Sequence, residues 1–200
     1  MENSEIFNHI STRLVEAVMM HSNFDDLFRY IGMPGFAKTQ LYQFICENHE
    51  MKSVNHYCIE HLNLLVANDD VSFKKYLPKE FIGVGKIDVS ALDKRDVVRY
   101  IIETWVEWEK GTKELYSNLS ISLNENHDTA SSLFVDELIK DVDLELKRAT
   151  DLLVWLKNID YDMCTIMLFQ DDYCRTYDVM ICNKLKENER RFKDEYHKLS

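Results

Sequence analysis

The sequence predicts an all-α protein built on a four-helix bundle. Only 5 of its 200 residues are glycine and 2 are proline, so the chain has little material for the many turns of a β protein. Apolar residues recur every three or four positions over four long stretches, the spacing of helices that bury one face. In the clearest stretch, 134–156, this face consists of Val135, Leu138, Val142, Ala149, Leu152 and Leu156.

One carboxylate interrupts that apolar face. Glu145 stands where the next apolar residue is due, between Val142 and Ala149. A carboxylate at the centre of an apolar face loses its water and requires a proton, a cation or a hydrogen-bond donor. We therefore expect polar side chains of other helices at the level of Glu145.

Two helices joined by a tight turn are expected in the N-terminal third. The first begins near Asn3 or Ser4, and its heptad row contains a single polar residue, His21. That row is Phe7, Ile10, Leu14, Ala17, His21, Phe24, Phe28 and Ile31. The sequence Gly-Met-Pro-Gly at 32–35 then predicts the end of the helix and a reversal of the chain.

The second helix, 36–66, is expected to turn most of its apolar residues inward. Glu47 then falls at the edge of the inward face, and Glu50 lies further out. The predicted inward row is Leu41, Phe44, Asn48, Met51, Asn55, Cys58, Leu62 and Leu65, flanked by Ile45 and Ile59. Periodicity disappears over 67–92, which predicts a long crossover.

The third helix opens at Asp93 and ends before a polar turn at 124–128. Its inward row is Val98, Ile101, Trp105, Trp108, Thr112, Leu115 and Leu119. Glu109 interrupts the adjacent apolar row, and Gly111 is the one glycine that we place inside a helix. Short connections make neighbouring helices antiparallel, whereas the long crossover makes the second and third helices parallel.

The C-terminal segment 159–200 is expected to form a helical extension of the bundle at 1–158. A fifth helix begins near Asp160 or Asp162 and carries apolar residues on one side over 163–181. That side needs a partner, so the helix either packs across the bundle or forms a two-fold homodimer. The charged tail 183–200 is either a solvated helix end or partly disordered.

Composition narrows the class of protein. The formal charge of −11 argues against nucleic acid as the main partner, because phosphates would be repelled. No apolar run is long enough to span a membrane, and the polar N-terminus has no signal peptide. The 5 cysteines are scattered without a C-x-x-C pair, which is typical of reduced thiols in the cytoplasm.

Two tightly joined helix pairs linked by a long crossover resemble the ferritin-like superfamily over residues 6–156. Residues 35–38 followed by Glu47 resemble the start of a ferritin second helix, and Glu109 with Lys110 resembles the third-helix glutamate. Residues 141–143 fall where the fourth helix has a glutamine or glutamate. The resemblance implies carboxylates from all four helices that meet at one level and hold two metal ions.

The sequence departs from that superfamily at the expected histidines. The Glu-x-x-His pair of the second helix is replaced by Glu47-x-x-Glu50, and the fourth helix has Asp141-x-x-Leu144. Glu16, the first-helix match, falls on the outer side of the heptad row. Four stretches also resemble a divergent ferritin-like group encoded by bacteriophages and mobile elements, a likeness that implies a fold and no activity: 28–47, 105–116, 141–147 and 159–163.

Two interpretations of the polar residues stay open. The first is a cage for iron or manganese, since a carboxylate-rich site with little imidazole suits Fe(II) or Mn(II). Its candidate ligands are His21, Glu47, Glu50, Glu109, Asp141 and Glu145. The second, favoured because both histidine positions fail, is a hydrogen-bond network. Its candidate partners for the carboxylates are His21, Asn48, Asn55 and Tyr116, with Arg148 or Lys110 nearby.

The favoured function is therefore non-enzymatic. It is that of a divergent ferritin-fold protein, encoded by a phage or mobile element, that acts through protein–protein contacts and keeps a degenerate metal site. The alternative is a ferritin-like di-metal oxidase that binds iron or manganese.

Overall fold

The computed structural model describes residues 2–66 and 93–198, with side chains described as far as residue 190. Helices account for nearly all of this part of the chain, and it contains no strand. The helices are α1 (Asn3–Tyr30), α2 (Pro34–Leu62), α3 (Lys94–Glu125), α4 (Thr129–Asn158) and α5 (Met163–Lys198). The all-α prediction with a fifth helix is thus confirmed.

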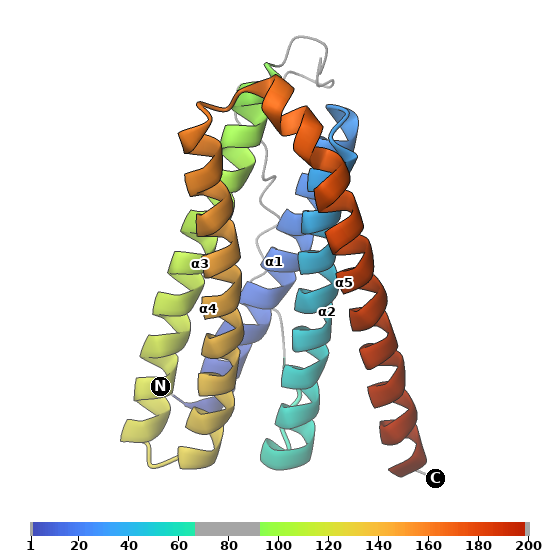
Figure 1. Ribbon diagram of the computed structural model, residues 1–200. Coiled ribbons are helices and arrows are strands. Elements are labelled where there is room, and N and C mark those ends of the chain that lie inside the picture. Colours follow the sequence, from blue (N-terminus) through green and yellow to red (C-terminus); the bar gives the residue numbers. More distant parts are fainter. Residues whose placement is uncertain (1, 67–92, 199–200) are drawn as a thin grey trace, which may run out of the picture.

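The directions of the helices are those of a bundle with a crossover (Figure 1). α1 is antiparallel to α2, and α3 is antiparallel to α4. α2 and α3 run in the same direction, so the end of α2 and the start of α3 lie at opposite ends of the bundle (Figure 1). This arrangement confirms the prediction made from loop lengths, although the crossover 67–92 itself lies outside the described residues.

Local signals set the helix ends. Gly32 adopts a φ of 77°, a left-handed conformation that favours glycine, and the Met33 amide donates to the Phe28 carbonyl at 2.8 Å. Asp128 caps α4 by accepting from the Ser131 amide at 3.1 Å. α2 stops at Leu62, four residues before the predicted end, because Asn63 turns left-handed with a φ of 49°.

The core consists of two apolar clusters at different levels of the bundle. One cluster, which we call the α5-side cluster, includes Met20, Phe24, Phe28, Phe36, Val98, Ile101, Ile102, Trp105, Ala149, Leu152, Leu156 and Ile166. The other, the α1-start cluster, includes Ile6, Phe7, Ile10, Leu14, Val54, Cys58, Tyr116, Leu119, Leu123, Val135, Leu138 and Val142. The heptad row predicted for α1 and the apolar face predicted for α4 are buried in these clusters, together with most of the α3 row.

The inward row predicted for α2 is wrong by about one position. Leu65 is 82% exposed and Ile59 is 53% exposed, whereas Glu47, placed at the edge of the face, is only 5% exposed. The row that faces the bundle is Phe36, Gln40, Gln43, Glu47, Val54 and Cys58. The prediction fails because both α1 and α5 pack against α2. Part of the apolar surface of α2 therefore faces the fifth helix.

α5 packs along α2, which is the first of the two alternatives given for its apolar side (Figure 1). Tyr173 stacks on Phe36 with ring centroids 5.1 Å apart. A Cβ atom on Gly35 would lie 2.4 Å from the backbone oxygen of Gln170, so this close approach requires glycine. Lys38 and Asp178 pair at 2.6 Å on the outside of the contact.

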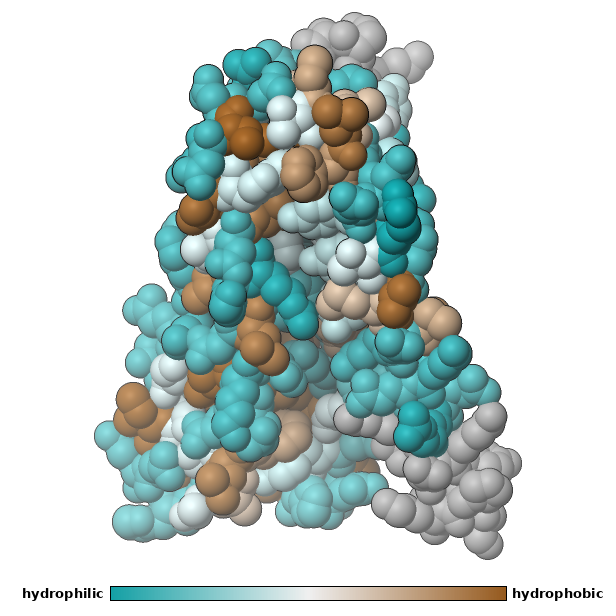
Figure 2. Space-filling model, in the orientation of Figure 1, coloured by the Kyte–Doolittle hydropathy of each residue, from teal (hydrophilic) through white to brown (hydrophobic). Residues whose placement is uncertain are grey.

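The face of the molecule drawn in Figure 2 is mainly hydrophilic. Figure 2 shows brown apolar side chains scattered among teal ones on one face of the molecule. Leu168 of α5 is 80% exposed. Within the described helices, none is both long and apolar enough to cross a membrane.

Candidate metal site in the polar layer

Four buried polar side chains separate the two apolar clusters, and each of the helices α1 to α4 contributes one. They are His21, Glu47, Glu109 and Glu145, whose exposed fractions are 0%, 5%, 1% and 4%. Each occupies an inward position of its helix, as Glu145 does in the apolar face of α4. We call this level of the bundle the polar layer.

Three of these side chains come close together. Ligand atoms of His21, Glu47 and Glu109 all lie within 4.8 Å of one another. The Nε2 atom of His21 is 3.9 Å from Oε1 of Glu109, which is too long for a hydrogen bond. Two ligand atoms that share one ion, each about 2.0–2.2 Å from it, are separated by about 3–4 Å. The 3.9 Å between His21 and Glu109 lies in this range, and Glu47 lies close enough to join them after a small shift.

The hydrogen bonds of His21 leave one ring nitrogen available. Its Nδ1 lies 2.8 Å from Oε1 of Gln40, while the amide nitrogen of Gln40 donates to Thr39 at 3.3 Å. With the Gln40 oxygen facing the ring, Nδ1 carries the proton and Nε2 carries the lone pair. Nε2 is buried and has no hydrogen-bond partner among the described residues.

Burial determines the charge of the imidazole. It lowers the pKa of His21 to about 4, an effect that the hydrogen bond donated to the Gln40 oxygen only partly offsets. At neutral pH the ring is therefore uncharged, which is the form that ligates metals.

The carboxyl groups of the layer hold their protons strongly. Burial raises the pKa of Glu109 to about 8, although the Trp105 indole, which donates to Glu109 at 3.0 Å, acts in the opposite direction. Burial, followed by the charge of neighbouring glutamates, raises the pKa values of Glu47 and Glu145 well above their ordinary value. The charges of Arg13, Arg148 and Lys184 act in the opposite direction but do not outweigh burial.

Glu50 and Asp141 lie further from the centre. Glu50 is half-buried on α2, and burial and the charge of Glu145 raise its pKa well above the ordinary value. The Asp141 side chain is exposed, one turn before Glu145 on α4, and its charge acts on both Glu50 and Glu145. The structure therefore brings His21, Glu47 and Glu109 together and places Asp141 at the rim.

In the described part of the chain, several side chains expected in the hydrogen-bond network do not contact the carboxylates of the layer. The Asn48 amide donates to the Phe44 carbonyl of its own helix at 2.8 Å, and Lys110 pairs with Glu107 at the surface. The Tyr116 hydroxyl is buried without a hydrogen-bond partner among the described residues. His21, expected beside Glu145, instead contacts Gln40 and faces Glu109.

Two buried polar residues were not predicted from the sequence: Gln40, which contacts His21, and Gln43, whose amide has no partner in the described chain. Gln43 precedes Glu47 by about one helical turn, and Gln40 precedes it by about two. A polar row at heptad spacing through Glu47 was the available signal.

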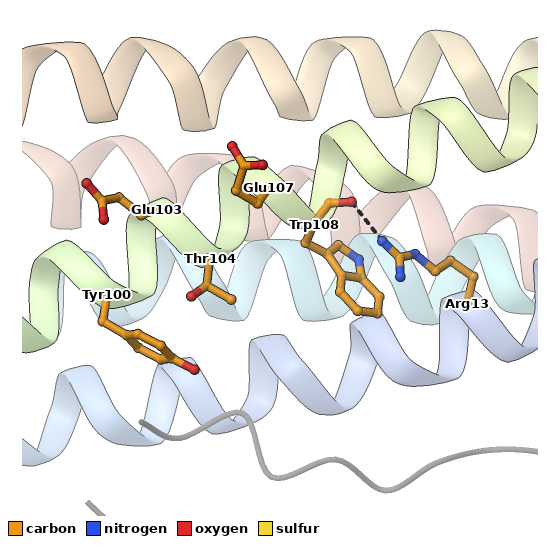
Figure 3. A pocket seen from close by; sticks show the side chains of 6 residues that line it. All are labelled: Arg13, Tyr100, Glu103, Thr104, Glu107 and Trp108. Carbon is orange, nitrogen blue, oxygen red and sulfur yellow. Dashed lines mark hydrogen bonds between the residues drawn. The ribbon is translucent and has the colours of Figure 1, made fainter. Parts of the chain in front are cut away.

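A groove of about 430 Å³ lies between α1 and α3, close to the layer (Figure 3). The guanidinium of Arg13 covers the Trp108 ring at 3.3 Å and donates to the Trp108 carbonyl at 2.8 Å. Glu103 and Glu107 also line the groove, and each pairs with a surface lysine. The acidic side chains of the groove are thus engaged at the surface, away from the polar layer.

No protein-family model matches the sequence, and neither does any curated protein. Solved ferritins do match the structure. A humanized archaeal ferritin aligns with a TM-score of 0.72 at 13% identity, over 87% of this chain and 96% of that chain. An open-pore ferritin from the hyperthermophilic archaeon Archaeoglobus fulgidus aligns with a TM-score of 0.68 at 15% identity, over the same shares of the two chains.

A form of the Archaeoglobus fulgidus ferritin closed by site-directed mutagenesis gives the same TM-score of 0.68 at 15% identity, over 87% of this chain and 96% of that chain. At such low identity the likeness concerns architecture. The chain has a ferritin-like fold.

Proposed function

We propose that this chain binds a divalent metal ion in its polar layer, with His21, Glu47 and Glu109 as ligands. One observation carries the proposal: a neutral, fully buried imidazole presents an unpartnered Nε2 to a buried carboxyl group 3.9 Å away. A histidine held through its other nitrogen by an oxygen acceptor is the usual arrangement of a metal ligand. Glu50 and Glu145 supply further carboxylate oxygens.

The donor set fits Fe(II) or Mn(II). Carboxylate oxygens with a single imidazole suit hard or borderline divalent ions. The nearby thiol of Cys46 is a weaker ligand at neutral pH, because burial raises its pKa to about 12. The same residues fit an ion better than they fit a hydrogen-bond network, since an ion would offset the desolvation of the carboxylates and displace their protons.

The chain's own residues would prepare this site. Gln40 holds the imidazole in the tautomer with a free Nε2, and the Trp105 indole fixes one oxygen of Glu109. The two apolar clusters exclude water on both sides of the layer. When bound, Fe(II) or Mn(II) supplies one-electron redox chemistry, which is the basis of the alternative oxidase function.

The favoured prediction from the sequence stays a prediction. A non-enzymatic role through a protein partner, a homodimer through α5, a phage or mobile-element origin and a location in the cytoplasm depend on sequence reasoning alone. The exposed apolar side chains Leu168 and Val179 of α5 are consistent with a contact of this kind, at 80% and 61% exposure.

Metal binding tests the proposal directly. Protein stripped with a chelator is titrated with Mn(II), or with Fe(II) without oxygen, and the melting temperature is followed. We expect near-stoichiometric binding and stabilisation by about 2.7 kcal/mol when the free metal exceeds its dissociation constant 100-fold. His21→Leu should abolish both effects. Asp143→Asn, which removes an exposed carboxylate paired with Lys113, should abolish neither. A wild-type chain that takes up no metal would overturn the proposal.

A further inference from the structure

We infer that the polar layer holds one divalent ion per chain and that Arg148 and Lys184 occupy the place of a second cation. This inference rests on the proposed metal-binding function and specifies its stoichiometry. It also assigns a role to α5, the helix that carries Lys184.

The polar layer has two sides with different chemistry. On one side, His21, Glu47 and Glu109 offer ligand atoms within 4.8 Å of one another. On the other side lie Glu145 and Glu50, to which the structure adds no imidazole from the described residues. The cations whose charges act on this second side are Arg148 and Lys184, which have no lone pair for a metal when protonated.

Arg148 bridges two helices at the second side. It follows Glu145 by three residues on α4, and it is half-buried. Its guanidinium carbon lies 5.5 Å from the centre of the Tyr42 ring on α2, so the side chain reaches across the gap between these helices. Arginine stays protonated under all ordinary conditions and therefore cannot yield its charge to an incoming ion.

Lys184 approaches the same side from α5. Its side chain is half-buried, and its charge acts on Glu50, Glu145 and Cys46. This placement follows from the packing of α5 along α2, which brings Tyr177 against Tyr42 with ring centroids 5.8 Å apart. The fifth helix thus adds a positive charge that acts on the carboxylates Glu50 and Glu145.

The charges balance with one metal ion. The layer contains three glutamates, Glu47, Glu109 and Glu145. With the adjoining Glu50 they carry four negative charges when ionised. One divalent ion with Arg148 and Lys184 supplies four positive charges. Arg13, whose charge acts on Glu109, and Asp141, whose charge acts on Glu145, carry opposite charges and cancel in this count. A second divalent ion would leave two uncompensated positive charges in a poorly solvated layer, which is strongly unfavourable.

The number of bound ions tests the inference. The full chain is titrated with Mn(II), bound metal is counted, and electron paramagnetic resonance separates isolated ions from magnetically coupled pairs. We expect one Mn(II) per chain with the spectrum of an isolated ion. Arg148→Gln combined with Lys184→Gln should raise the number to two, with a coupled spectrum. Lys147→Gln, which removes an exposed lysine paired with Asp151, should leave one ion.

Each outcome is decisive. Two coupled ions in the wild-type chain would overturn the inference and leave the proposed function standing. No bound ion in the wild-type chain would overturn both. One ion in the wild-type chain and still one in the double variant, with its helical content unchanged, would overturn the role of Arg148 and Lys184.

Discussion

The two apolar clusters and the polar layer between them are built from the same four helices but differ in how well their members are satisfied. In the clusters, large side chains such as Phe24 and Phe28 are fully buried against one another. In the layer, Nε2 of His21, the Gln43 amide and the nearby Tyr116 hydroxyl lack partners in the described part of the chain. Such a layer reduces stability, so the comparison indicates that the clusters hold the fold and the layer serves a ligand.

The largest expected effect is a difference in the free energy of unfolding between a substitution in a cluster and a substitution in the polar layer. Phe28→Ala removes a fully buried ring and should lower the free energy of unfolding by about 3–5 kcal/mol. Glu145→Leu replaces a desolvated carboxyl with an apolar side chain of similar volume and should leave stability equal or higher in chelator. Urea unfolding of both variants measures the difference. Similar losses in both would show that the layer supports the fold as much as the clusters do.

The next effect concerns the residue that orients the imidazole. Gln40→Leu removes the oxygen acceptor of His21 Nδ1 and should lower stability by about 1–3 kcal/mol, because a buried donor loses its partner. Metal affinity should fall about 10–100-fold, as for other supports of metal ligands. Gln40→Glu keeps an oxygen acceptor and serves as the control. Calorimetric titration with Mn(II) checks the affinity, and equal affinity in all three proteins would refute the positioning role.

The contrast between α2 and α4 explains which inward-facing residues can be predicted from the sequence. On α4 a single polar residue, Glu145, interrupts an otherwise apolar face, so the face and its exception were both predicted. On α2 the inward row contains Gln40, Gln43 and Glu47, while apolar residues serve a second contact with α5. Periodicity finds the most apolar side of a helix, and for α2 that side is not the one that faces the bundle.

The candidate site shows the same limit. His21, Glu109 and Glu145 were predicted as buried polar residues because each breaks an apolar row. The convergence of His21, Glu47 and Glu109 depends on how four helices are aligned along the bundle, which loop lengths do not specify. The positions of Arg148 and Lys184 depend on the docking of α5, for which the sequence left two alternatives.

A third prediction uses pH to separate the layer from the clusters, whose buried Cys58 and Tyr116 titrate only far above neutral pH. Glu109 has a pKa of about 8 when folded and an ordinary value of 4.5, so the folded chain binds an extra proton between these values. Metal-free stability should therefore fall as pH rises towards 8. Protonation of His21 destabilises the folded chain only between pH 6.5 and about pH 4. The change in stability between pH 6.5 and 8 therefore reports the carboxyl groups.

The expected loss across that window is about 1–2 kcal/mol from Glu109 alone, since one pH unit corresponds to about 1.4 kcal/mol per group. The raised pKa values of Glu47 and Glu145 act in the same direction. Glu109→Gln should reduce the slope, and bound Mn(II) should reverse it, because metal binding displaces protons. Urea unfolding at several pH values provides the measurement. A flat profile in chelator would mean that the carboxyl groups of the layer are already compensated.

The smallest effect concerns Gly111, an exposed glycine inside α3 at the level of the polar layer. A Cβ atom there would lie 3.3 Å from a terminal nitrogen of Arg13, the flexible end of a side chain that can shift slightly. Alanine favours a helix over glycine by about 1 kcal/mol, so Gly111→Ala should raise stability by somewhat less than that. The contrasting variant is Gly35→Ala. Its Cβ would meet the Gln170 backbone at 2.4 Å, so this substitution should lower stability.

Gly111→Ala should also change how stability depends on pH. Arg13 lowers the pKa of Glu109, and the new Cβ displaces the guanidinium of Arg13. The loss of stability between pH 6.5 and 8 should therefore become steeper. Thermal melts of the metal-free proteins at those two pH values measure both effects. A loss of stability in Gly111→Ala at both would show that the contact of Arg13 with α3 is rigid, and that the rim of the layer is packed as tightly as the clusters.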